Sequence, residues 1–303
     1  MGPRTLATDA DFPAALFSGE PLFADTDGDG LPDRLRLFLA VDPRLSHPAL
    51  WAEAANFAAR LAAEVAALDP PVVHPLADLP PDRPALLLHA PDPGREIAAR
   101  LERRDRLHLH LVGHSAKAMA EILHRLACRG GGLNPPPGWE TLELVGEREA
   151  CAFFRGDRGR RLGRLRLMRR QSSPGEAEDD FREECDLLRP GETVFRAVAD
   201  EPRGRRLTLA FGICAPRLPA VVGFALCEAA ARLALEATVV DLPLAFAGPA
   251  PRGALILEIR PDSASGARLE RAPSTGGGAR AVLRLTGGPQ PVARLLRLWA
   301  ELA

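Results

Sequence analysis

Hydrophobic and polar residues alternate along two stretches of the chain, residues 34–41 (RLRLFLAV) and 206–213 (RLTLAFGI). A period of two predicts a β-strand with one buried face in each stretch. An alanine-rich segment follows both, with apolar residues at three- and four-residue steps, which predicts a helix that packs on a sheet through one apolar stripe. The stripe residues are Leu50, Ala54, Phe57, Leu61 and Val65 in the first helix, and Val222, Leu226, Ala229, Leu233 and Ala237 in the second.

The order of predicted elements after the helix is also the same in the two parts of the chain. A short extended segment, a buried strand, a further strand and a closing helix follow in both. Their residues are 72–73, 85–90, 107–113 and 115–129 in the first part, and 239–240, 254–259, 282–287 and 290–302 in the second. Each part therefore has the order β-α-β-β-β-α, which predicts an α/β sandwich.

A comparison of the chain with itself relates the two parts in sequence. The matches share an offset of 172 residues (195 − 23). They pair Phe23 with Phe195, Leu35 with Leu207, Leu37 with Leu209, and the AARLA segment 58–62 with 230–234. These matches predict that one domain is present twice.

We therefore expect an α/β protein of two tandem duplicated sandwich domains, residues 20–130 and 191–303. Residues 131–190 differ in composition, with glycine and proline at 130–139, arginines around a predicted strand at 162–168, and acids at 172–184. This segment predicts a linker with one strand, and its acidic part is either a short helix or a flexible stretch.

Composition and charge narrow the classes of function and partner. With 303 residues, 46% of them hydrophobic, the chain can form two cores of ordinary size. The net charge of −1 gives no global field toward nucleic acid or an anionic membrane. Arginine replaces lysine everywhere except Lys117 and tyrosine is absent, a bias typical of GC-rich bacteria. We expect a cytoplasmic protein, because no signal peptide and no apolar run of about 18 residues is visible.

The acidic segment 24–35, ADTDGDGLPDRL, has the most suggestive spacing. Alternate carboxylates and a glycine suit a hard cation that takes six to eight oxygen ligands, so Ca²⁺ is the one cofactor expected. The alternative is a hairpin turn whose acids are solvated. At the offset of 172, the second copy has no equivalent acids except Glu201. The candidate ligands are Asp25, Asp27, Asp29 and Asp33.

The junction Gly113-His114-Ser115 follows a strand and precedes a helix, as a hydrolase nucleophile elbow does. His114 and Ser115 are therefore candidate catalytic residues, although Lys117 stands where that motif requires glycine. Ser115 also suits a helix N-cap, and Ser115 with Lys117 can hold an anion at a helix N-terminus. Nearby, His108 and His110 share one strand face, which suits either a transition-metal site or solvated side chains.

Several segments resemble the non-catalytic N-terminal modules of bacterial M14-like zinc carboxypeptidases. They are DTDGDGLPDRLRL, AANFAARLAAE, ALDPPVV and LHLHLVGHSAKAMAEIL. The acidic loop is also similar to the calcium loops of thrombospondin type-3 repeats and dockerins. The peptidase zinc motif H-x-x-E is absent, since Leu50 lies three residues after His47. The resemblance therefore implies an accessory module without peptidase chemistry.

Two functions follow from these observations. The first is a non-enzymatic accessory or interaction protein with a protein partner and one calcium loop. The alternative is a hydrolase-type enzyme whose site lies in a cleft between the two copies. Its residues are His108, His110, His114 and Ser115 from the first copy, facing Arg284 of the second.

Overall fold

A computed structural model describes most of the two predicted domains and little of the linker. The described residues are 23–24, 34–35, 37–63, 65, 71–95, 98–103, 107–127, 141–142, 151–154, 194–198, 201–248, 254–272 and 281–301. We refer to residues 23–127 as the first half and to residues 194–301 as the second half.

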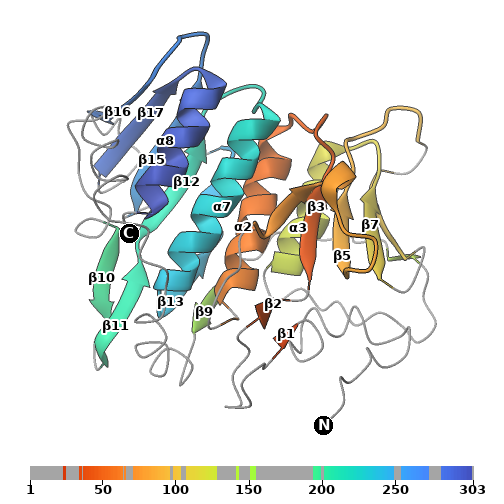
Figure 1. Ribbon diagram of the computed structural model, residues 1–303, viewed down its shortest axis with the longest axis horizontal. Coiled ribbons are helices and arrows are strands. Elements are labelled where there is room, and N and C mark those ends of the chain that lie inside the picture. The colour runs from red at the N-terminus through yellow and green to blue at the C-terminus, as the bar shows by residue number, and fades with distance from the viewer. Residues whose placement is uncertain are drawn as a thin grey trace.

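In the first half, two short strands precede a sheet covered by two helices (Figure 1). The elements in chain order are β1 (Phe23–Ala24), β2 (Arg34–Leu35), β3 (Phe38–Val41), α2 (Pro48–Ala63), β4 (Val73–Pro75), the 3₁₀ helix η2 (Leu76–Asp78), β5 (Ala85–Leu88), β6 (Arg100–Arg103), β7 (His108–Val112) and α3 (Ala116–Ala127).

Two linker strands and then the second half follow. The linker strands are β8 (Thr141–Leu142) and β9 (Cys151–Phe154). The second half consists of β10 (Phe195–Val198), β11 (Glu201–Leu207), β12 (Leu209–Ile213), α7 (Ala220–Glu236), β13 (Val239–Leu242), β14 (Ala245–Phe246), β15 (Leu255–Pro261), β16 (Ala267–Ala272), β17 (Ala281–Gly287) and α8 (Pro289–Glu301).

The two main sheets share the same strand order over five positions, and the first has one further strand. The first is β4-β3-β5-β7-β6-β8 and the second is β14-β12-β15-β17-β16. The strands β4, β3, β5 and β7 are parallel while β6 is antiparallel to β7, and the corresponding strands of the second sheet have the same directions. The prediction of an α/β protein is confirmed at this level.

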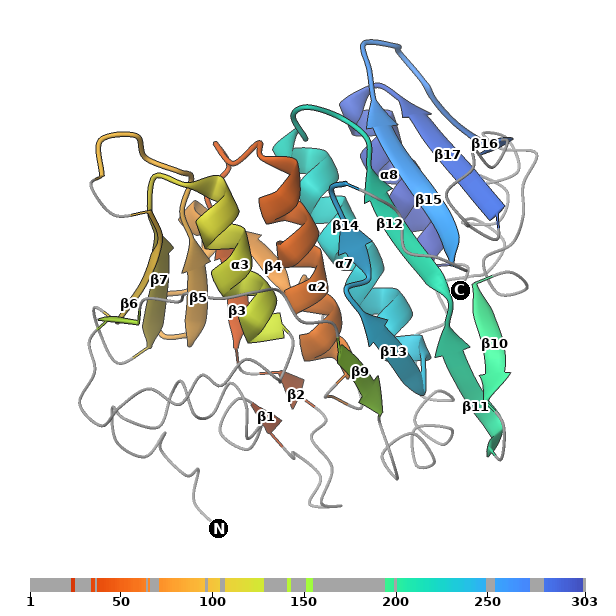
Figure 2. The same ribbon diagram turned by 180° about the vertical axis from the view of Figure 1, so that it is seen from behind.

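The helices of the two halves lie on opposite sides of the molecule. Figure 1 shows α7 and α8 in front of the second sheet, and Figure 2, seen from behind, shows α2 and α3 in front of the first sheet. The helices α2 and α7 pack against each other at the centre. Each also contacts the edge strand of the other half, because α2 touches β14 and α7 touches β4. The contact between the halves is therefore reciprocal.

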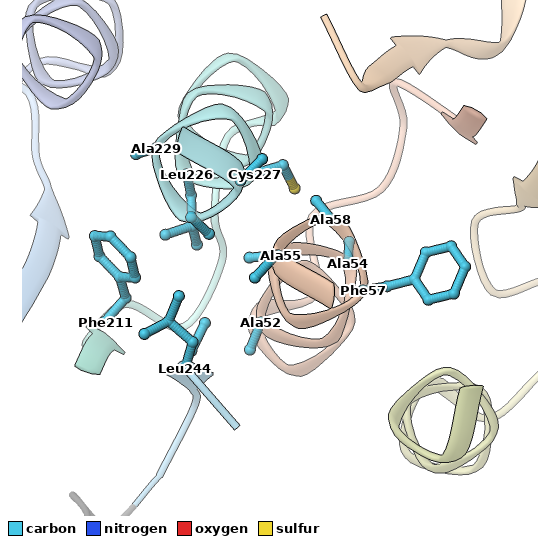
Figure 3. Close-up of a cluster of buried hydrophobic side chains, with 14 of the residues drawn as sticks. Ala52, Ala54, Ala55, Phe57, Ala58, Phe211, Leu226, Cys227, Ala229 and Leu244 are labelled. Atoms are coloured by element: carbon cyan, nitrogen blue, oxygen red, sulfur yellow. The ribbon is translucent and has the colours of Figure 1, made fainter. Parts of the chain in front are cut away.

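The central helices differ from the amphipathic helices that the sequence predicts. Every residue of α2 from Leu50 to Ala63 is buried, so the helix has packing partners on all sides. Small side chains allow this, and Figure 3 shows Ala55 and Ala58 of α2 turned toward Leu226 and Cys227 of α7. Two predicted stripe residues, Val65 and Ala237, lie outside the helices, which end at Ala63 and Glu236.

A larger side chain also crosses the contact between α2 and α7. The Trp51 ring is fully buried and packs edge-on against Phe224, with ring centroids 5.1 Å apart. Its Nε1–H donates to the Leu45 carbonyl oxygen at 3.1 Å. A Cβ at Gly223 would lie 2.2 Å from this ring, so the glycine provides the space that the indole fills.

The two alternating stretches each contain two strands and not one, which corrects the prediction. The stretch 34–41 divides into β2 and β3, and 206–213 divides into β11 and β12. Thr208 shows the reason: its N–H donates to Val194 before β10, while its carbonyl oxygen accepts from Leu255 of β15. The chain changes sheets there without interrupting its alternation, so the pattern does not reveal the break.

Two further predictions of strands need correction. Each main sheet contains a strand that was not predicted, β6 or β16, which is antiparallel to the strand that follows it. The predicted counterpart of segment 72–73, residues 239–240, lies in β13 of a separate sheet, β10-β11-β13-β9. The strand at the position of β4 in the second sheet is β14, because the chain in this half first pairs with β11 and β9.

The described residues of the linker add one strand to each half. β8 pairs with β6, and β9 pairs with β13. The predicted linker strand 162–168 and the acidic segment 172–184 lie outside the described residues. No helix in the described part of the chain is long and apolar enough to span a bilayer.

Candidate functional site

The side chains at the predicted nucleophile junction make structural hydrogen bonds. Ser115 precedes α3, and its Oγ accepts a hydrogen bond from the Ala118 N–H at 3.3 Å. This is the bond expected of a helix N-cap. The exposed His114 has its Nδ1 3.0 Å from the Arg95 carbonyl oxygen, in the loop before β6. A nucleophile and its base must lie within hydrogen-bonding reach of each other, whereas these two side chains contact different partners.

The backbone of this junction recurs in the second half. The Gly113 carbonyl oxygen accepts from Asp92 N–H at 2.9 Å, and that of Gly287 accepts from Asp262 N–H at 2.8 Å. A Cβ would lie 2.3 Å from a backbone oxygen at Gly113 and 2.1 Å from one at Gly287. Both junctions therefore require glycine because the backbone that leads into β6 or β16 passes close to them. The residues that follow the two glycines, His114-Ser115 and Gly288-Pro289, differ.

Lys117 is exposed in the first turn of α3, close to Ser115. The Ser115 hydroxyl can still donate to an anion while its oxygen accepts from Ala118. The anion site predicted from Ser115 and Lys117 therefore stays a prediction.

Histidines do gather on the face of the first sheet that carries the side chains of β7 at positions 108 and 110. His89 Nε2 lies 3.0 Å from His110 Nδ1, and the two rings stack at 5.2 Å between centroids. His110 lies between Leu87 of β5 and Glu102 of β6 in the strand register. The cluster is thus a hydrogen-bonded pair of half-buried imidazoles with a carboxylate on the neighbouring strand.

The same place in the second sheet carries an ion pair instead. Arg284 of β17 lies between Glu258 of β15 and Glu270 of β16. Its Nε donates to Glu258 Oε2 at 3.0 Å. His110 and Arg284 thus occupy the same register position in the two sheets.

The structure does not bring the histidines and Arg284 into one site. β7 and β17 belong to different sheets, near opposite ends of the molecule, with α2 and α7 between them (Figures 1 and 2). The cleft between the halves that the hydrolase alternative requires would be filled by these buried helices. A groove of about 410 Å³ is present instead within the second half, where β11 passes to β12, and its lining includes Arg196, Arg206 and Asp241.

Among the described residues, no three histidine, cysteine, aspartate or glutamate side chains are grouped as a metal site requires. The predicted calcium ligands Asp25, Asp27, Asp29 and Asp33 lie outside the described residues. The flanking strands are described, and β1 pairs antiparallel with β2. The acidic segment thus connects the two strands of a hairpin, which suits both the calcium loop and the turn.

A buried polar cluster was not predicted from the sequence. Glu53 of α2 accepts from Asn56 Nδ2 at 3.0 Å and lies 3.0 Å from His124 Nδ1 of α3. Asn56 also joins the halves, since its Nδ2 donates to the Ala245 carbonyl oxygen at 3.0 Å and its Oδ1 accepts from the Ala245 N–H at 2.7 Å. A Glu-x-x-Asn pair within an apolar helix was the available signal. The residues it contacts are distant in sequence and gave none.

A second polar link joins the helices of the second half. Arg297 of α8 donates to Glu228 of α7, and both side chains are partly exposed. The pair joins α7 to α8 as Glu53 and His124 join α2 to α3. The geometry supports a structural function for both pairs, which is to hold neighbouring helices in a fixed packing.

No protein-family model matches the chain, and no curated protein matches it either.

Proposed function

We propose that the chain is a non-enzymatic accessory or interaction protein built from one duplicated α/β unit. The hairpins before the main sheets support the duplication. Phe23 pairs with Leu35 in β1–β2, and Phe195 pairs with Leu207 in β10–β11. These are the residues that match at the offset of 172, so sequence and strand register agree.

The extra antiparallel strands support the same proposal. β6 and β16 occupy the same place in their sheets, and both carry the sequence ARLER, at 99–103 and 267–271. In each, the glutamate lies opposite the matched position of the next strand, His110 or Arg284. Unrelated sheets would not be expected to share order, direction and sequence at an irregular strand.

One observation carries the non-enzymatic part of the proposal. The strand-to-helix junction keeps its backbone hydrogen bonds and its glycine in both halves, while the reactive side chains occur in one half only. In that half, Ser115 caps α3 and His114 faces the Arg95 carbonyl oxygen. These hydrogen bonds serve the fold, and the side chains that differ between the halves are the ones that a partner can recognise.

The proposal includes a calcium loop at residues 25–33 and a protein partner. Closure of the β1–β2 hairpin holds the two ends of the acidic segment together, which reduces the entropy that a cation must overcome to order the loop. A role beside a catalytic domain agrees with the resemblance to the modules of M14-like carboxypeptidases.

The test of the non-enzymatic role is turnover of an activated ester by the full chain and by its Ser115→Ala and His114→Ala variants. We expect the same slow rate from all three proteins, since nonspecific surface catalysis does not depend on these side chains. Turnover that is lost in both variants, with unchanged thermal unfolding, would refute the role and favour the hydrolase.

The calcium loop is tested separately by calorimetric titration. We expect binding heat in the full chain that disappears in Asp27→Ala and Asp29→Ala. Asp82→Ala, at an exposed position of another loop, is the matched control and should leave the heat unchanged. If the control and the loop variants give the same heat, residues 25–33 form a turn and not a metal site.

A further inference from the structure

The outer edge of β16 differs from the same edge in the first half. β6 pairs with β7 on one side and with the linker strand β8 on the other. β16 pairs with β17 on one side, and no strand among the described residues pairs with its other side. Figure 2 shows β16 at the outer end of the second sheet. An open strand edge is a template for another strand, and the first half uses its equivalent edge in this way.

The hydrogen-bonding groups available at this edge follow from the register. The Gly288 N–H donates to the Gly266 carbonyl oxygen, and these residues continue the β16–β17 pairing. Hydrogen-bonded pairs alternate along an antiparallel ladder. The backbone groups of Arg268 and Glu270 therefore face β17, while those of Ala267, Leu269 and Arg271 face outward. These three alternate positions lack proline, so their backbone groups can pair with a partner strand.

The charges along β16 are self-complementary. Arg268 and Glu270 lie on one face of the strand, 71% and 38% exposed, with Arg268 Nη2 3.3 Å from Glu270 Oε2. If a second β16 pairs antiparallel about a two-fold axis through Leu269, Arg268 lies opposite Glu270 of the second copy, and the reverse pair forms by symmetry. Opposite charges stabilise such cross-strand pairs, and like charges destabilise them.

Other symmetric registers lack this match. An axis through Glu270 sets two glutamates against each other, and an axis through Arg268 sets two arginines against each other. The axis through Leu269 also brings the outward backbone groups of the two leucines together as a hydrogen-bonded pair. Charge thus selects the register centred on Leu269, and the outward hydrogen-bonding groups are compatible with it.

We propose that β16 is a homodimer interface, at which the second sheets of two copies join through antiparallel β16 strands centred on Leu269. The inference rests on the proposed interaction role and names a second copy of this chain as a partner. The strand has six residues. Because so short a strand makes a small interface, the dimer should be in concentration-dependent equilibrium with the monomer.

Analytical ultracentrifugation of the full chain over a series of concentrations tests the dimer. We expect Arg268→Glu and Glu270→Arg each to raise the dimer Kd by about tenfold, since each change turns two attractive pairs into repulsive ones. The double variant should recover the wild-type Kd. Arg271→Glu is the control, because it changes the net charge equally but lies opposite Ala267 of the second copy, and it should leave the Kd unchanged.

Mixing the two single variants provides an independent test. Arg268→Glu against Glu270→Arg restores both opposite-charge pairs, so the mixture should form a heterodimer more tightly than either variant alone dimerises. Thermal unfolding of each variant checks the fold, and the double variant decides the outcome if a single variant unfolds. A wild-type chain that stays monomeric, or a Kd that is equal in all variants, would overturn the interface.

This outcome is distinguishable from failure of the proposed function. Loss of ester turnover in Ser115→Ala would refute the non-enzymatic role without affecting the dimer measurement. A monomeric chain would refute the interface without affecting the ester result.

Discussion

Replacing Asn56 with alanine should weaken the contact between the two halves. Asn56 is fully buried, and its amide makes hydrogen bonds to the N–H and the carbonyl oxygen of Ala245 and to Glu53. The Phe211 N–H of β12 donates to the carbonyl oxygen of Leu244, the residue before β14, so the backbone groups of Leu244 face β12. Those of Ala245 therefore face α2, where the Asn56 amide takes the place of a neighbouring strand.

The magnitude follows from the groups that lose their partners. The N–H and carbonyl oxygen of Ala245, a residue 1% exposed, would be left without the Asn56 amide. An unsatisfied buried polar group costs about 1–3 kcal/mol, so we expect Asn56→Ala to lower the free energy of unfolding by about 2–6 kcal/mol. Domains are stable by about 5–15 kcal/mol, so this loss is large.

Urea unfolding followed by circular dichroism measures the change, and Asn56→Leu is the matched control for volume. Leucine fills most of the space but makes no hydrogen bond, so it should be nearly as destabilising as alanine. Amide exchange at Ala245 should also accelerate in both variants. A loss below about 1 kcal/mol in Asn56→Ala, or wild-type stability in Asn56→Leu, would refute the role of the amide in joining the halves.

Three further predictions concern single residues. Hydrogen bonding to Arg44 lowers the pKa of the buried Asp42, so this carboxylate contributes stability above its unfolded pKa that is lost as pH falls through its lower folded pKa. Arg44→Ala should therefore lower the urea midpoint at neutral pH, and a difference from wild type that persists in acid would contradict the linkage. Burial raises the pKa of the Cys227 thiol well above its usual range. Iodoacetamide labelling followed by peptide mapping should detect Cys214 in the native protein and Cys227 only after unfolding. Labelling of Cys227 in the native protein would show that the contact between α2 and α7 opens. Gly223→Ala should drive a methyl group into the Trp51 indole packed against it and lower the free energy of unfolding by about 1–3 kcal/mol. A rise in the thermal midpoint, as helix propensity alone predicts, would contradict this close contact.

The main elements were predictable because their apolar periods are local. The central strands and the α-helices of the described residues follow from steps of two or of three and four residues. The two antiparallel strands were not predicted, since β6 and β16 are charged and each has a single leucine, Leu101 or Leu269. Their shared ARLER sequence was the signal, and it becomes visible only when the two halves are compared. The change of sheet at Thr208 left no local signal, because alternation continues through it.

The candidate site was less predictable because side-chain partners depend on packing. The alternation of His108 and His110 correctly places both on one strand face, and in the structure His89 lies beside His110. The partner of His124 is Glu53, 71 residues away, and that of Asn56 is Ala245, 189 residues away. No periodicity specifies such contacts, which arise only when α2 packs against α3 and β14.

The account depends most on the claim that one structural framework is present twice, and paired substitutions at Gly113 and Gly287 test it most directly. A Cβ at either position would lie within 2.3 Å of a backbone oxygen, which cannot move aside without shifting a strand. Thermal unfolding of Gly113→Ala and Gly287→Ala should show that each loses at least about 2 kcal/mol of stability. Wild-type stability in one variant, with severe loss in the other, would contradict the equivalence of the two halves.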